Sequence, residues 1–485
     1  MVQTREGIQD VIADLKPYPA YVDSGISWLG GVPEAWNVLR ARHMFEIKRR
    51  IAGELGHPVL SVTQSGLRIK DVNSGKGQVS LDYSKYQVVC PGEFVMNSMD
   101  LLTGGVGIAD AAGVTSPDYR VFTIRDAGQY KDRYALHVLR MLYANRGFYA
   151  WGQGSAQLGR WRLPRKRFNE FPFPVPPLPE QSAIVRFLDH ADRRIRRYVA
   201  AKRKLIALLN EQKLAIIHRA VTRGIDPNVR LKPSGVEWLG DVPEHWEVRK
   251  LRQCGTIKGG MTPSMEVRQF WDGDIPWVTP KDMKSSVICN SLIRVTNAAI
   301  EQTGLAMIAA GAVLLVVRGM ILARRVPIAW TNADVTINQD MKALILGSDI
   351  SPQFMASSLE SAQEAFAALI DEAGHGTRRL PTERWRDLAI ALPPLDEQRA
   401  IVGSIEGETQ VFMTTTAKAQ REIDLLREYR TRLIADVVTG KLDVREAAAS
   451  LPDGADEPEE LEEADILAEA SDELEDVAVE GEALV

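Results

Sequence analysis

The chain contains one framework twice. Residues 24–38 read SGISWLGGVPEAWNV and residues 234–248 read SGVEWLGDVPEHWEV, with ten of fifteen positions identical at an offset of 210. Residues 176–185 (PPLPEQSAIV) match residues 393–402 (PPLDEQRAIV) at eight of ten positions, at an offset of 217, and scattered identities continue to Asp226 and Asp443. Because a fixed internal period marks a repeat architecture, we expect a tandem duplication of a unit slightly over 200 residues long.

Between the repeated segments the two copies diverge. Short β-branched and aromatic runs at 59–62, 87–90, 120–124 and 313–317 are typical of strands, and Gly, Asn, Asp and Pro clusters separate them. Residues 134–143 and 354–370 have helical patterns. We therefore expect two α+β heads built on one scaffold, and their different interiors indicate that each head recognises something different.

Each Pro-Pro-Leu segment precedes a long helix. In the first, a heptad seam is predicted at Ile184, Leu188, Ala191, Ile195, Tyr198, Leu205, Leu209 and Ile216, with Lys202 and Gln212 also on the seam. In the second, the seam is Ile401, Ile405, Phe412, Ala419, Ile423, Leu426, Leu433 and Val437. Neither helix can bury its stripe alone. The alternatives are that each stripe docks on its own head, or that the helices pack together.

Packing together is the interpretation that we favour. The link between the first helix and the second head is short, so the second helix must run back along the first. The expected fold class is α+β: two tandem heads separated by two long helices that form an antiparallel coiled coil, with pseudo-two-fold symmetry. A helix of about 40 residues is about 60 Å long.

Composition excludes several classes of protein. The chain has 485 residues and three cysteines, Cys90, Cys254 and Cys289, which make no C-x-x-C pair, so a disulfide scaffold or a zinc ribbon is not expected. The N-terminus lacks the apolar core of a signal peptide, and the longest apolar run, 305–317, is too short to cross a bilayer. We expect an intracellular, cytoplasmic protein that does not contact a membrane.

The charge is unevenly distributed. Residues 446–485 hold 16 Asp and Glu and no Lys or Arg, which leaves 59 basic against 48 acidic residues in 1–445, a net charge of +11. A basic body suggests a polyanionic partner, although a solvated surface with a disordered acidic tail gives the same count.

Catalytic signatures are weak. The sequence has no phosphate-binding G-x-x-x-x-G-K-[ST], no strand-linked G-x-G-x-x-G and no H-E-x-x-H. The triplets Glu46-Ile47-Lys48 and Asp340-Met341-Lys342 have the carboxylate-x-Lys form of metal nucleases, but such triplets are common by chance. No catalytic or metal-binding residue is predicted.

Polar and basic loops are the candidate binding elements. Gln and Arg side chains can read adenine and guanine, and Lys and Arg neutralise phosphates. The predicted DNA-binding residues of the first head are Lys48, Arg49, Arg50, Ser61, Thr63, Gln64, Arg68, Lys70, Gln153 and Ser155. Those of the second head are Lys258, Thr262, Ser264, Thr279, Lys281, Lys284, His375, Thr377 and Arg378. Trp28, Trp36, Trp238 and Trp246 repeat in the frame, which favours domain packing over stacking on bases.

The entry motif, the KGGMTPS turn at 258–264, the PPLDEQRAIV helix start and the closing VVTGKLDVREA strongly resemble specificity subunits of type I restriction–modification systems over about residues 20–446. The first head departs from this pattern, with Lys48-Arg49-Arg50 in place of Lys258-Gly259-Gly260, and the acidic tail lies outside it. The resemblance implies a non-catalytic subunit whose heads are target-recognition domains, each reading one half of a bipartite double-stranded DNA site. The helices would set the spacer between the halves.

The resemblance also implies partners. Two methylation subunits would modify adenine N6 with S-adenosylmethionine, and restriction subunits would use ATP and Mg²⁺, so this chain itself would hold no cofactor. Glu180, Gln181, Glu397 and Gln398 at the helix starts are predicted to dock these subunits. Two rivals stay open: an enzyme that cleaves or methylates DNA itself, and a coiled-coil adaptor whose heads bind protein.

On this interpretation the chain divides at defined positions. The expected order is an N-terminal extension (1–22), target-recognition domain 1 (23–178), a central helix (179–223), target-recognition domain 2 (224–395), a C-terminal helix (396–445) and an acidic disordered tail (446–485).

Overall fold

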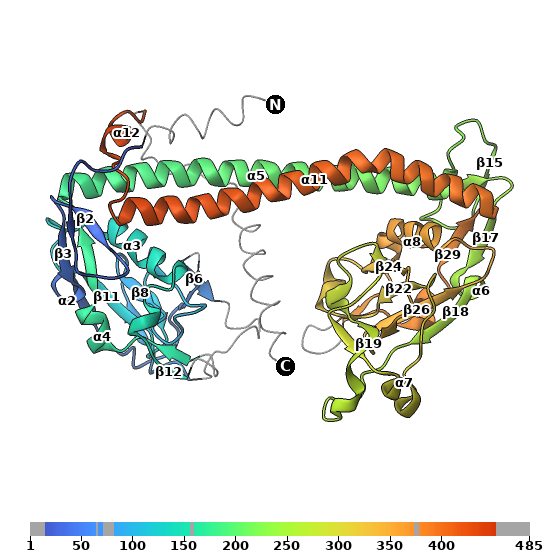
Figure 1. Ribbon diagram of the computed structural model, residues 1–485, viewed down its shortest axis with the longest axis horizontal. Coiled ribbons are helices and arrows are strands. Elements are labelled where there is room, and N and C mark those ends of the chain that lie inside the picture. The colour runs from blue at the N-terminus through green and yellow to red at the C-terminus, as the bar shows by residue number, and fades with distance from the viewer. Residues whose placement is uncertain (1–14, 65, 71–81, 156–159, 373–377, 453–485) are drawn as a thin grey trace. The chain divides into compact units, whose positions relative to one another are not determined.

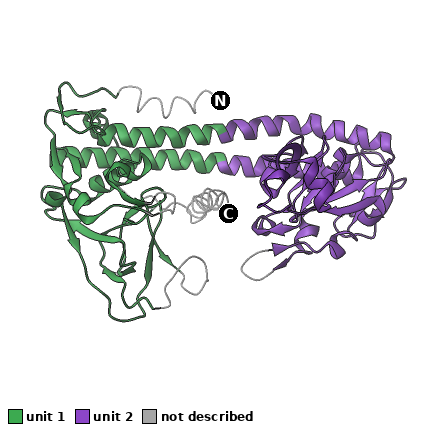
Figure 2. Ribbon diagram, turned by 60° about the horizontal axis from the view of Figure 1, so that its bottom comes forward, with its two compact units in different colours: residues 1–202, 421–485 green, residues 203–420 purple. Residues whose placement is uncertain are grey.

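The chain divides into two compact units. Unit 1 consists of residues 1–202 and 421–485, and unit 2 of residues 203–420 (Figure 2). The structure is a computed structural model that describes residues 15–64, 66–70, 82–155, 160–372 and 378–452. Most of the predicted acidic tail, from 453 on, lies outside the described residues. Two long helices, α5 (Leu178–Arg223) and α11 (Leu395–Val438), each contribute one part to each unit.

Unit 1 is a mixed α+β domain. Its sheets have the strand orders β6-β5-β10-β7 and β4-β11-β8-β9, with β1-β2, β14-β3 and β12-β13 as two-stranded pairs. Its elements besides the long helices are β1 (Tyr21–Asp23), β2 (Gly31–Pro33), β3 (Asn37–Arg40), α2 (Ala41–Met44), β4 (Phe45–Lys48), β5 (Val59–Val62), β6 (Leu67–Lys70), β7 (Gln87–Val89), β8 (Phe94–Met96), β9 (Val106–Ile108), β10 (Gly113–Thr115), β11 (Arg120–Ile124), α3 (Asp132–Ala144), η1 (Tyr149–Trp151), β12 (Gln153–Ser155), β13 (Arg160–Arg162), α4 (Arg165–Glu170), β14 (Pro172–Val175) and α12 (Arg445–Ala449).

Aromatic side chains form the centre of the unit 1 core. Phe94 and Phe122 stack with ring centroids 5.0 Å apart, and Phe45 packs edge-on against Phe122 at 5.0 Å. The core continues onto the first turns of α5 and the last turns of α11, where Ile184 and Val437 are fully buried. Alternating apolar residues on β4, β8 and β11 therefore bury one face of the sheet under α3 and the long helices (Figure 1).

Unit 2 has a similar composition of helices and strands but different sheets. Their orders are β18-β26-β22-β24-β20, β21-β19-β25 and β23-β28-β27, with the pairs β15-β16 and β17-β29. The elements are β15 (Leu231–Pro233), β16 (Asp241–Pro243), β17 (Glu247–Lys250), α6 (Leu251–Cys254), β18 (Gly255–Gly259), η3 (Arg268–Phe270), β19 (Trp271–Val278), η4 (Pro280–Asp282), β20 (Val287–Ile288), β21 (Ile293–Val295), α7 (Asn297–Thr303), β22 (Val313–Val316), β23 (Arg318–Gly319), η5 (Met320–Ala323), β24 (Ile328–Thr331), β25 (Thr336–Ile337), β26 (Met341–Leu346), α8 (Pro352–Ser361), α9 (Gln363–Ala367), β27 (Asp371–Glu372), β28 (Arg378–Arg379), α10 (Thr382–Trp385) and β29 (Ala389–Leu392).

The predicted strands and helices are largely present, and one prediction needs correction. The all-apolar strand β22 is fully buried at the centre of the five-stranded sheet, as its composition indicates. The helical pattern at 354–370 forms two helices rather than one, because the backbone leaves the helical region at Ala362 (φ −90°, ψ 20°). Leu359 before the break and Phe366 after it are both fully buried.

The frame elements repeat in space as they do in sequence. β1, β2, β3, α2 and β4 recur as β15, β16, β17, α6 and β18 with starts shifted by 210 residues, and β14 and α5 recur as β29 and α11 shifted by 217. In each unit the strand after the entry motif pairs with the strand before the long helix, β3 with β14 and β17 with β29. Trp36 and Trp246 are buried, and Trp28 and Trp238 pack on the cores, so the predicted packing role of these side chains is confirmed.

The two long helices pack together and run antiparallel. Within unit 1, Arg430 pairs with Asp192, and Lys202 Nζ lies 2.7 Å from Glu422 Oε2. Within unit 2, Arg219 lies 3.3 Å from Glu408. As the residue numbers along α5 increase, the residue numbers of their partners on α11 decrease, which is the pattern of antiparallel helices (Figure 1). The predicted fold class, two mixed domains with two long helices that pack together, is confirmed.

The register of the first helix differs from the predicted heptads. Leu205, predicted on the seam, is 37% exposed, and Gln212 is exposed, whereas Ile206 and Lys213 are half-buried. The side chains that point inward include four isoleucines eleven residues apart: Ile184, Ile195, Ile206 and Ile217. Eleven residues make three turns at about 3.6 to 3.7 residues per turn, so the seam keeps the regular α-helical period instead of the 3.5-residue period of heptads.

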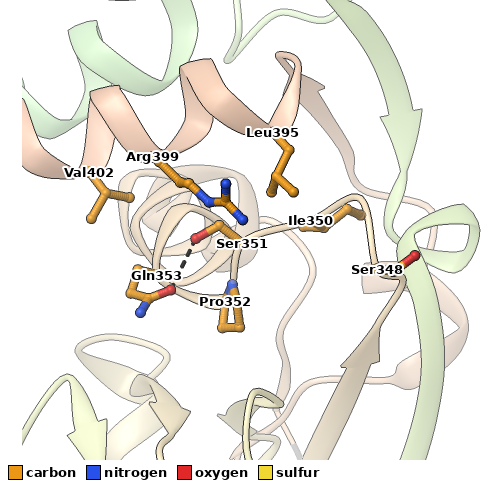
Figure 3. A pocket seen from close by; sticks show the side chains of 8 residues that line it. All are labelled: Ser348, Ile350, Ser351, Pro352, Gln353, Leu395, Arg399 and Val402. Atoms are coloured by element: carbon orange, nitrogen blue, oxygen red, sulfur yellow. Dashed lines mark hydrogen bonds between the residues drawn. The ribbon is translucent and has the colours of Figure 1, made fainter.

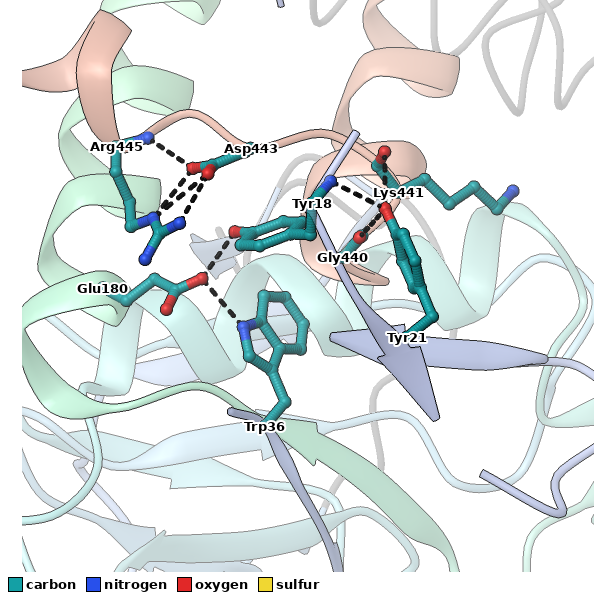
Figure 4. A network of polar contacts seen from close by, with 8 residues as sticks. All are labelled: Tyr18, Tyr21, Trp36, Glu180, Gly440, Lys441, Asp443 and Arg445. Atoms are coloured by element: carbon teal, nitrogen blue, oxygen red, sulfur yellow. Dashed lines mark hydrogen bonds and ion pairs between the residues drawn. The ribbon is translucent and has the colours of Figure 1, made fainter. Parts of the chain in front are cut away.

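Segments from both ends of the described chain meet on the frame of unit 1 (Figure 4). Tyr18 donates to Glu180 Oε1, and Tyr21 donates to the carbonyl oxygens of Gly440 and Lys441 at 3.1 and 3.2 Å. The Arg445 guanidinium lies over the ring of Tyr18 at 5.3 Å. These contacts fix the end of α11 against the entry motif of the first repeat.

In the part of the chain that the structure describes, no helix combines the length and the apolar character needed to cross a membrane.

Candidate nucleic-acid interface

Five of the residues predicted from the first head lie on one β-hairpin of unit 1. β5 and β6 pair in antiparallel register, with Ser61 opposite Arg68. The turn between them is closed by Thr63, whose backbone N donates to the Gly66 carbonyl at 2.7 Å and whose hydroxyl donates to the same oxygen at 2.9 Å. Gln64 is exposed at the tip of this turn. The hairpin thus brings together Ser61, Thr63, Gln64, Arg68 and Lys70.

A second hairpin, β12–β13, is held near the first by the loop at 97–105. A Cβ at Gly105 would lie 2.3 Å from the Thr63 carbonyl oxygen, so only glycine permits this close approach. On its other side the loop is fixed by Leu101, whose backbone N donates to the Trp161 carbonyl at 3.1 Å. Gln153 is exposed at the start of β12. The structure therefore brings Gln153 to the same side of unit 1 as the Gln64 turn; Ser155 ends β12, and its side chain is outside the description.

Lys48, Arg49 and Arg50 are not part of this group. They lie at and beyond the end of β4, which is one edge strand of a four-stranded sheet. The opposite edge strand, β9, is the one that contacts the Gln64 hairpin, through Gly107 and Leu67. Lys48 Nζ lies 2.8 Å from Glu46, and its hydrogen bond lowers the pKa of that carboxyl. Arg50 pairs with Glu93, which also accepts from the Cys90 backbone N at 2.8 Å.

The sequence analysis missed an aromatic pair beside the second hairpin. The rings of Tyr149 and Trp161 stack at 5.2 Å, and Trp161 Nε1 donates to the Tyr149 carbonyl at 2.8 Å. Tyr149 is 38% exposed, and Arg162 next to Trp161 is exposed as well. The signal was present in the sequence as Arg160-Trp161-Arg162, an aromatic residue between two basic ones, which is typical of nucleic-acid surfaces.

In unit 2 the KGGMTPS turn is held rigidly by two tryptophans. Trp277 Nε1 donates to the Met261 carbonyl at 3.1 Å, and Trp271 Nε1 donates to the Ser264 carbonyl at 3.0 Å. Lys258, in β18 ahead of the turn, is exposed. The turn is thus a preformed surface with exposed polar side chains.

A segment far along the chain joins this turn to the next predicted group. The Thr262 hydroxyl donates to Gln339 Oε1, and the neighbouring Asn338 backbone N donates to the Val278 carbonyl at 3.0 Å. Thr279 follows directly and caps η4, with its backbone N and its hydroxyl 2.8 and 2.9 Å from Asp282 Oδ2. The structure therefore places Thr262 and Thr279 beside residues 337–339, which were not predicted, and the predicted residues Ser264, Lys281 and Lys284 lie on or next to the same two turns.

The late hairpin of unit 2, β27–β28, corresponds to β12–β13 at the offset of 217. Leu163 and Leu380 occupy matching positions, and their backbone N atoms donate to the carbonyls of Ser98 and Val317, both at 2.9 Å. Arg378, predicted to bind DNA, lies 3.5 Å from Glu372. The predicted residues His375 and Thr377 fall outside the described residues.

Three of the four residues predicted to dock partner subunits are buried in the frame. Glu180, Gln181 and Gln398 are buried, with 5%, 1% and 0% of their surface exposed. Gln181 Oε1 accepts from the Lys131 backbone N at 2.8 Å, and Gln398 Oε1 accepts from the Ser351 backbone N at 2.7 Å, which fixes the starts of α3 and α8. These contacts give the three buried side chains a structural role in the frame, and docking of partner subunits at the helix starts stays a prediction. Glu397, with 29% of its side chain exposed, binds His245 and Trp246.

The carboxylates of the two carboxylate-x-Lys triplets have partners within the chain. Glu46 pairs with the Lys48 of its own triplet. Asp340 accepts from Asn338 Nδ2 at 3.2 Å, and partial burial raises its pKa while nearby Arg318 opposes the shift. Among the described residues, no group of three His, Cys, Asp or Glu side chains is placed to hold a metal ion.

A cavity of about 360 Å³ lies in unit 2 between the start of α8 and the first turns of α11 (Figure 3). Ile350, Leu395 and Val402 give it an apolar wall, and the Ser351 hydroxyl donates to Gln353 Oε1 at 3.0 Å. Its one cationic lining residue, Arg399, lies 3.3 Å from Asp396. None of the predicted DNA-binding residues that the structure describes lines it, so the candidate interface is the surface of hairpins and turns.

Comparison with known proteins agrees with this architecture. Residues 33–204 and 243–422, more than half of the chain, match the type I restriction modification DNA specificity domain. The chain is 28% identical over 263 residues to the type I restriction enzyme EcoR124I/EcoR124II specificity subunit of Escherichia coli, which covers 53% of this chain and 60% of that protein. It is also 28% identical over 167 residues to the MjaIX specificity subunit of Methanocaldococcus jannaschii, over 34% of this chain and 38% of that one.

A solved structure from work on complex assembly and conformational transition of the type I R-M system has the same fold. It superposes with a TM-score of 0.57 at 14% identity and covers 85% of this chain and 99% of the other. The duplicated frame, the two packed long helices and the two matched segments lead to one assignment: this chain belongs to the family defined by the type I restriction modification DNA specificity domain, which it carries twice.

Proposed function

We propose that this chain is the DNA-specificity subunit of a type I restriction–modification complex. Each unit reads one half of a bipartite, asymmetric duplex site, and α5 with α11 sets the number of base pairs between the halves. The observation that carries the proposal is the combination of one repeated frame with two different interiors: the frame elements recur at offsets of 210 and 217, whereas the sheets between them differ.

The grouped side chains support direct reading of bases. The exposed amides of Gln64 and Gln153 in unit 1 can make paired hydrogen bonds to adenine. In unit 2, Thr262 and Thr279 lie on rigid turns next to the exposed Lys281 and Lys284. Polar groups on fixed turns supply sequence selection, and the neighbouring cations supply affinity for the phosphate backbone.

Catalysis is proposed to belong to partner subunits. Two methylation subunits would transfer a methyl group from S-adenosylmethionine to adenine N6, and restriction subunits would use ATP and Mg²⁺. The outward faces of α5 and α11 are candidate docking surfaces because Leu208, Val411 and Leu425 are 50%, 70% and 55% exposed there. The aligned region spans only 60% of the length of the Escherichia coli relative, so these partners rest on family membership.

The proposal is tested by mapping N6-methyladenine across a genome that carries the methylation subunit with and without this chain. A bipartite motif that is methylated only when the chain is present is the expected result. The purified chain alone, supplied with DNA and S-adenosylmethionine or Mg²⁺, should show no turnover. Methylation that is independent of the chain, or turnover by the chain alone, would refute the proposal.

A further inference from the structure

An apolar turn in unit 2 is exposed to solvent. Met320 is 71% exposed and Ile321 is 39% exposed, whereas the next residue, Leu322, is 2% exposed and anchors the turn in the core. Gly319, which precedes it, has φ +136°, a conformation that other residues rarely adopt. Exposing two large apolar side chains at the tip of an anchored turn costs solvation free energy, which is a common signature of a contact surface.

Two arginines lie directly opposite each other beside this turn. Arg318 of β23 is in register with Arg379 of β28, and opposite residues of an antiparallel pair project to the same face. Like charges in this arrangement are destabilising. Across the residues that the structure covers, neither arginine has an ion pair or a side-chain hydrogen bond.

The nearby carboxylates are bonded to other groups, although Asp340 attracts Arg318 electrostatically. Asp371, opposite Arg379 on its other side, has its carboxylate 2.6 Å from Arg384, and Glu372 lies 3.5 Å from Arg378. Asp340, near Arg318, is half-buried and bonded to Asn338. Two adjacent arginines of this kind are expected where a bound anion from another molecule offsets their mutual repulsion.

The apolar turn and the arginine pair form one rigid element. η5, which contains Met320 and Ile321, packs against β28, which contains Arg379. The backbone of Leu380 then bonds to Val317 at 2.9 Å, which locks β28 to the strand that precedes the turn. Duplex DNA offers both chemistries that this element requires, because its phosphates are anionic and its base edges and steps accept apolar side chains.

We propose that residues 318–321 together with Arg379 are a DNA-reading element of unit 2. Arg318 and Arg379 bind backbone phosphates, and Met320 makes an apolar contact with a base of the half-site that unit 2 reads. The proposal rests on the proposed function and adds to it residues that no sequence pattern indicated, because Arg318 and Arg379 are brought together only by strand pairing.

The test uses the complex of the full chain with its methylation subunits and compares binding to the mapped duplex site with binding to every single-base-pair variant, at several salt concentrations. Met320→Ser should weaken binding to the cognate site about tenfold and reduce discrimination at one or two adjacent base pairs of one half-site, with an unchanged salt dependence. Arg379→Gln should weaken binding to all variants by a similar factor and lower the slope of log K against log salt by about one.

Two control variants lie on the repeated frame of the same unit. Leu231→Ser changes an apolar side chain that is 42% exposed, and Arg252→Gln removes an arginine that lies 3.1 Å from Asp387. Both should leave affinity, discrimination and salt slope unchanged. If Met320→Ser retains full discrimination, or Arg379→Gln retains the full salt slope, in a complex that binds its site, the reading element is refuted. A parent complex that has no sequence preference would instead refute the proposed function.

Discussion

The indole Nε1 of Trp36 donates a hydrogen bond to Glu180 Oε1 across 2.8 Å, and the equivalent pair of the second repeat, Trp246 and Glu397, lies at 3.0 Å. Each bond joins an entry motif to the first turn of a long helix, and so connects the two sequence segments that repeat at different offsets. Glu180 is 5% exposed, whereas the side chain of Glu397 is 29% exposed. The same bond therefore has different surroundings in the two units.

This difference predicts unequal losses of stability. Glu180→Ala leaves the Trp36 indole and the Tyr18 hydroxyl without their acceptor in a buried place, and should lower the free energy of unfolding by about 2–3 kcal/mol. Glu397→Ala should cost about 1 kcal/mol, because the Glu397 side chain itself is partly exposed and water can take its place beside Trp246 and His245. Urea denaturation of the two variants measures both values. A larger loss for Glu397→Ala would contradict this interpretation of the frame.

Ionisation of Tyr18 is expected to lower the stability of the protein at alkaline pH. Burial, and next the hydrogen bond to Glu180, raise the pKa of Tyr18 above its ordinary value, which in an unfolded chain is about 10. Its contribution to stability is therefore fully present below about pH 10 and is lost as the pH rises from there toward the folded-state pKa. Denaturation between about pH 9 and 11 should show a shallower decline for Tyr18→Phe than for the parent. Parallel declines would show that Tyr18 does not titrate differently in the two states.

Gly440 lies where the end of α11 packs closely against the entry motif of the first repeat, so a substitution there tests this fit. It has φ +77°, and a Cβ there would lie 2.4 Å from Pro33 Cδ and 3.2 Å from the Trp36 ring. Gly440→Ala should destabilise the protein by about 1–3 kcal/mol. The matched control is Gly403→Ala, within α11 and with no atom near its would-be Cβ, which should stabilise by about 0.5–1 kcal/mol. Thermal denaturation separates the two; a neutral Gly440→Ala would contradict the close fit.

The seam of the long helices predicts how the spacer can be shortened. Because inward residues recur every eleven positions, removing residues 199–209 from α5 and 412–422 from α11 keeps both seams in phase, whereas removing seven residues from each would not. Eleven residues correspond to about 16 Å of helix, so the preferred spacer should shorten, by at most about five base pairs at about 3.4 Å each. Mapping the methylated motif of this variant measures the spacer. An unchanged spacer would show that the helices do not set it.

Sequence patterns predicted most of the frame and less of the surface. The repeat at 210 and 217, the long helices and the buried strand at 313–316 follow from identity and apolar periodicity, which depend on local sequence. The seam of α5 beyond Tyr198 was misassigned because heptad and regular helical periods differ by only about 0.1 to 0.2 residue per turn. At the helix starts, Gln181 and Gln398 bond backbone groups, whereas Glu180 and Glu397 bond tryptophan side chains, and no local pattern indicated these partners.

The rest depended on long-range pairing. Thr262 contacts Gln339 and Arg318 pairs with Arg379, although the partners are 77 and 61 positions apart in the sequence. No local sequence pattern indicates such contacts. Glu46 and Asp340, the carboxylates of the two nuclease-like triplets, each have a local partner, Lys48 and Asn338. The sequence therefore indicates which kinds of residues on loops can bind DNA, and the fold determines which of them lie close together.

The central claim is that each unit reads its own half of one DNA site. It is tested most directly by replacing residues 39–175 with the same region of another family member and mapping methylated adenines in cells that carry the methylation subunit. The account predicts a new sequence in one half of the motif, with the other half and the spacer unchanged. A change in both halves, or in neither, would contradict it.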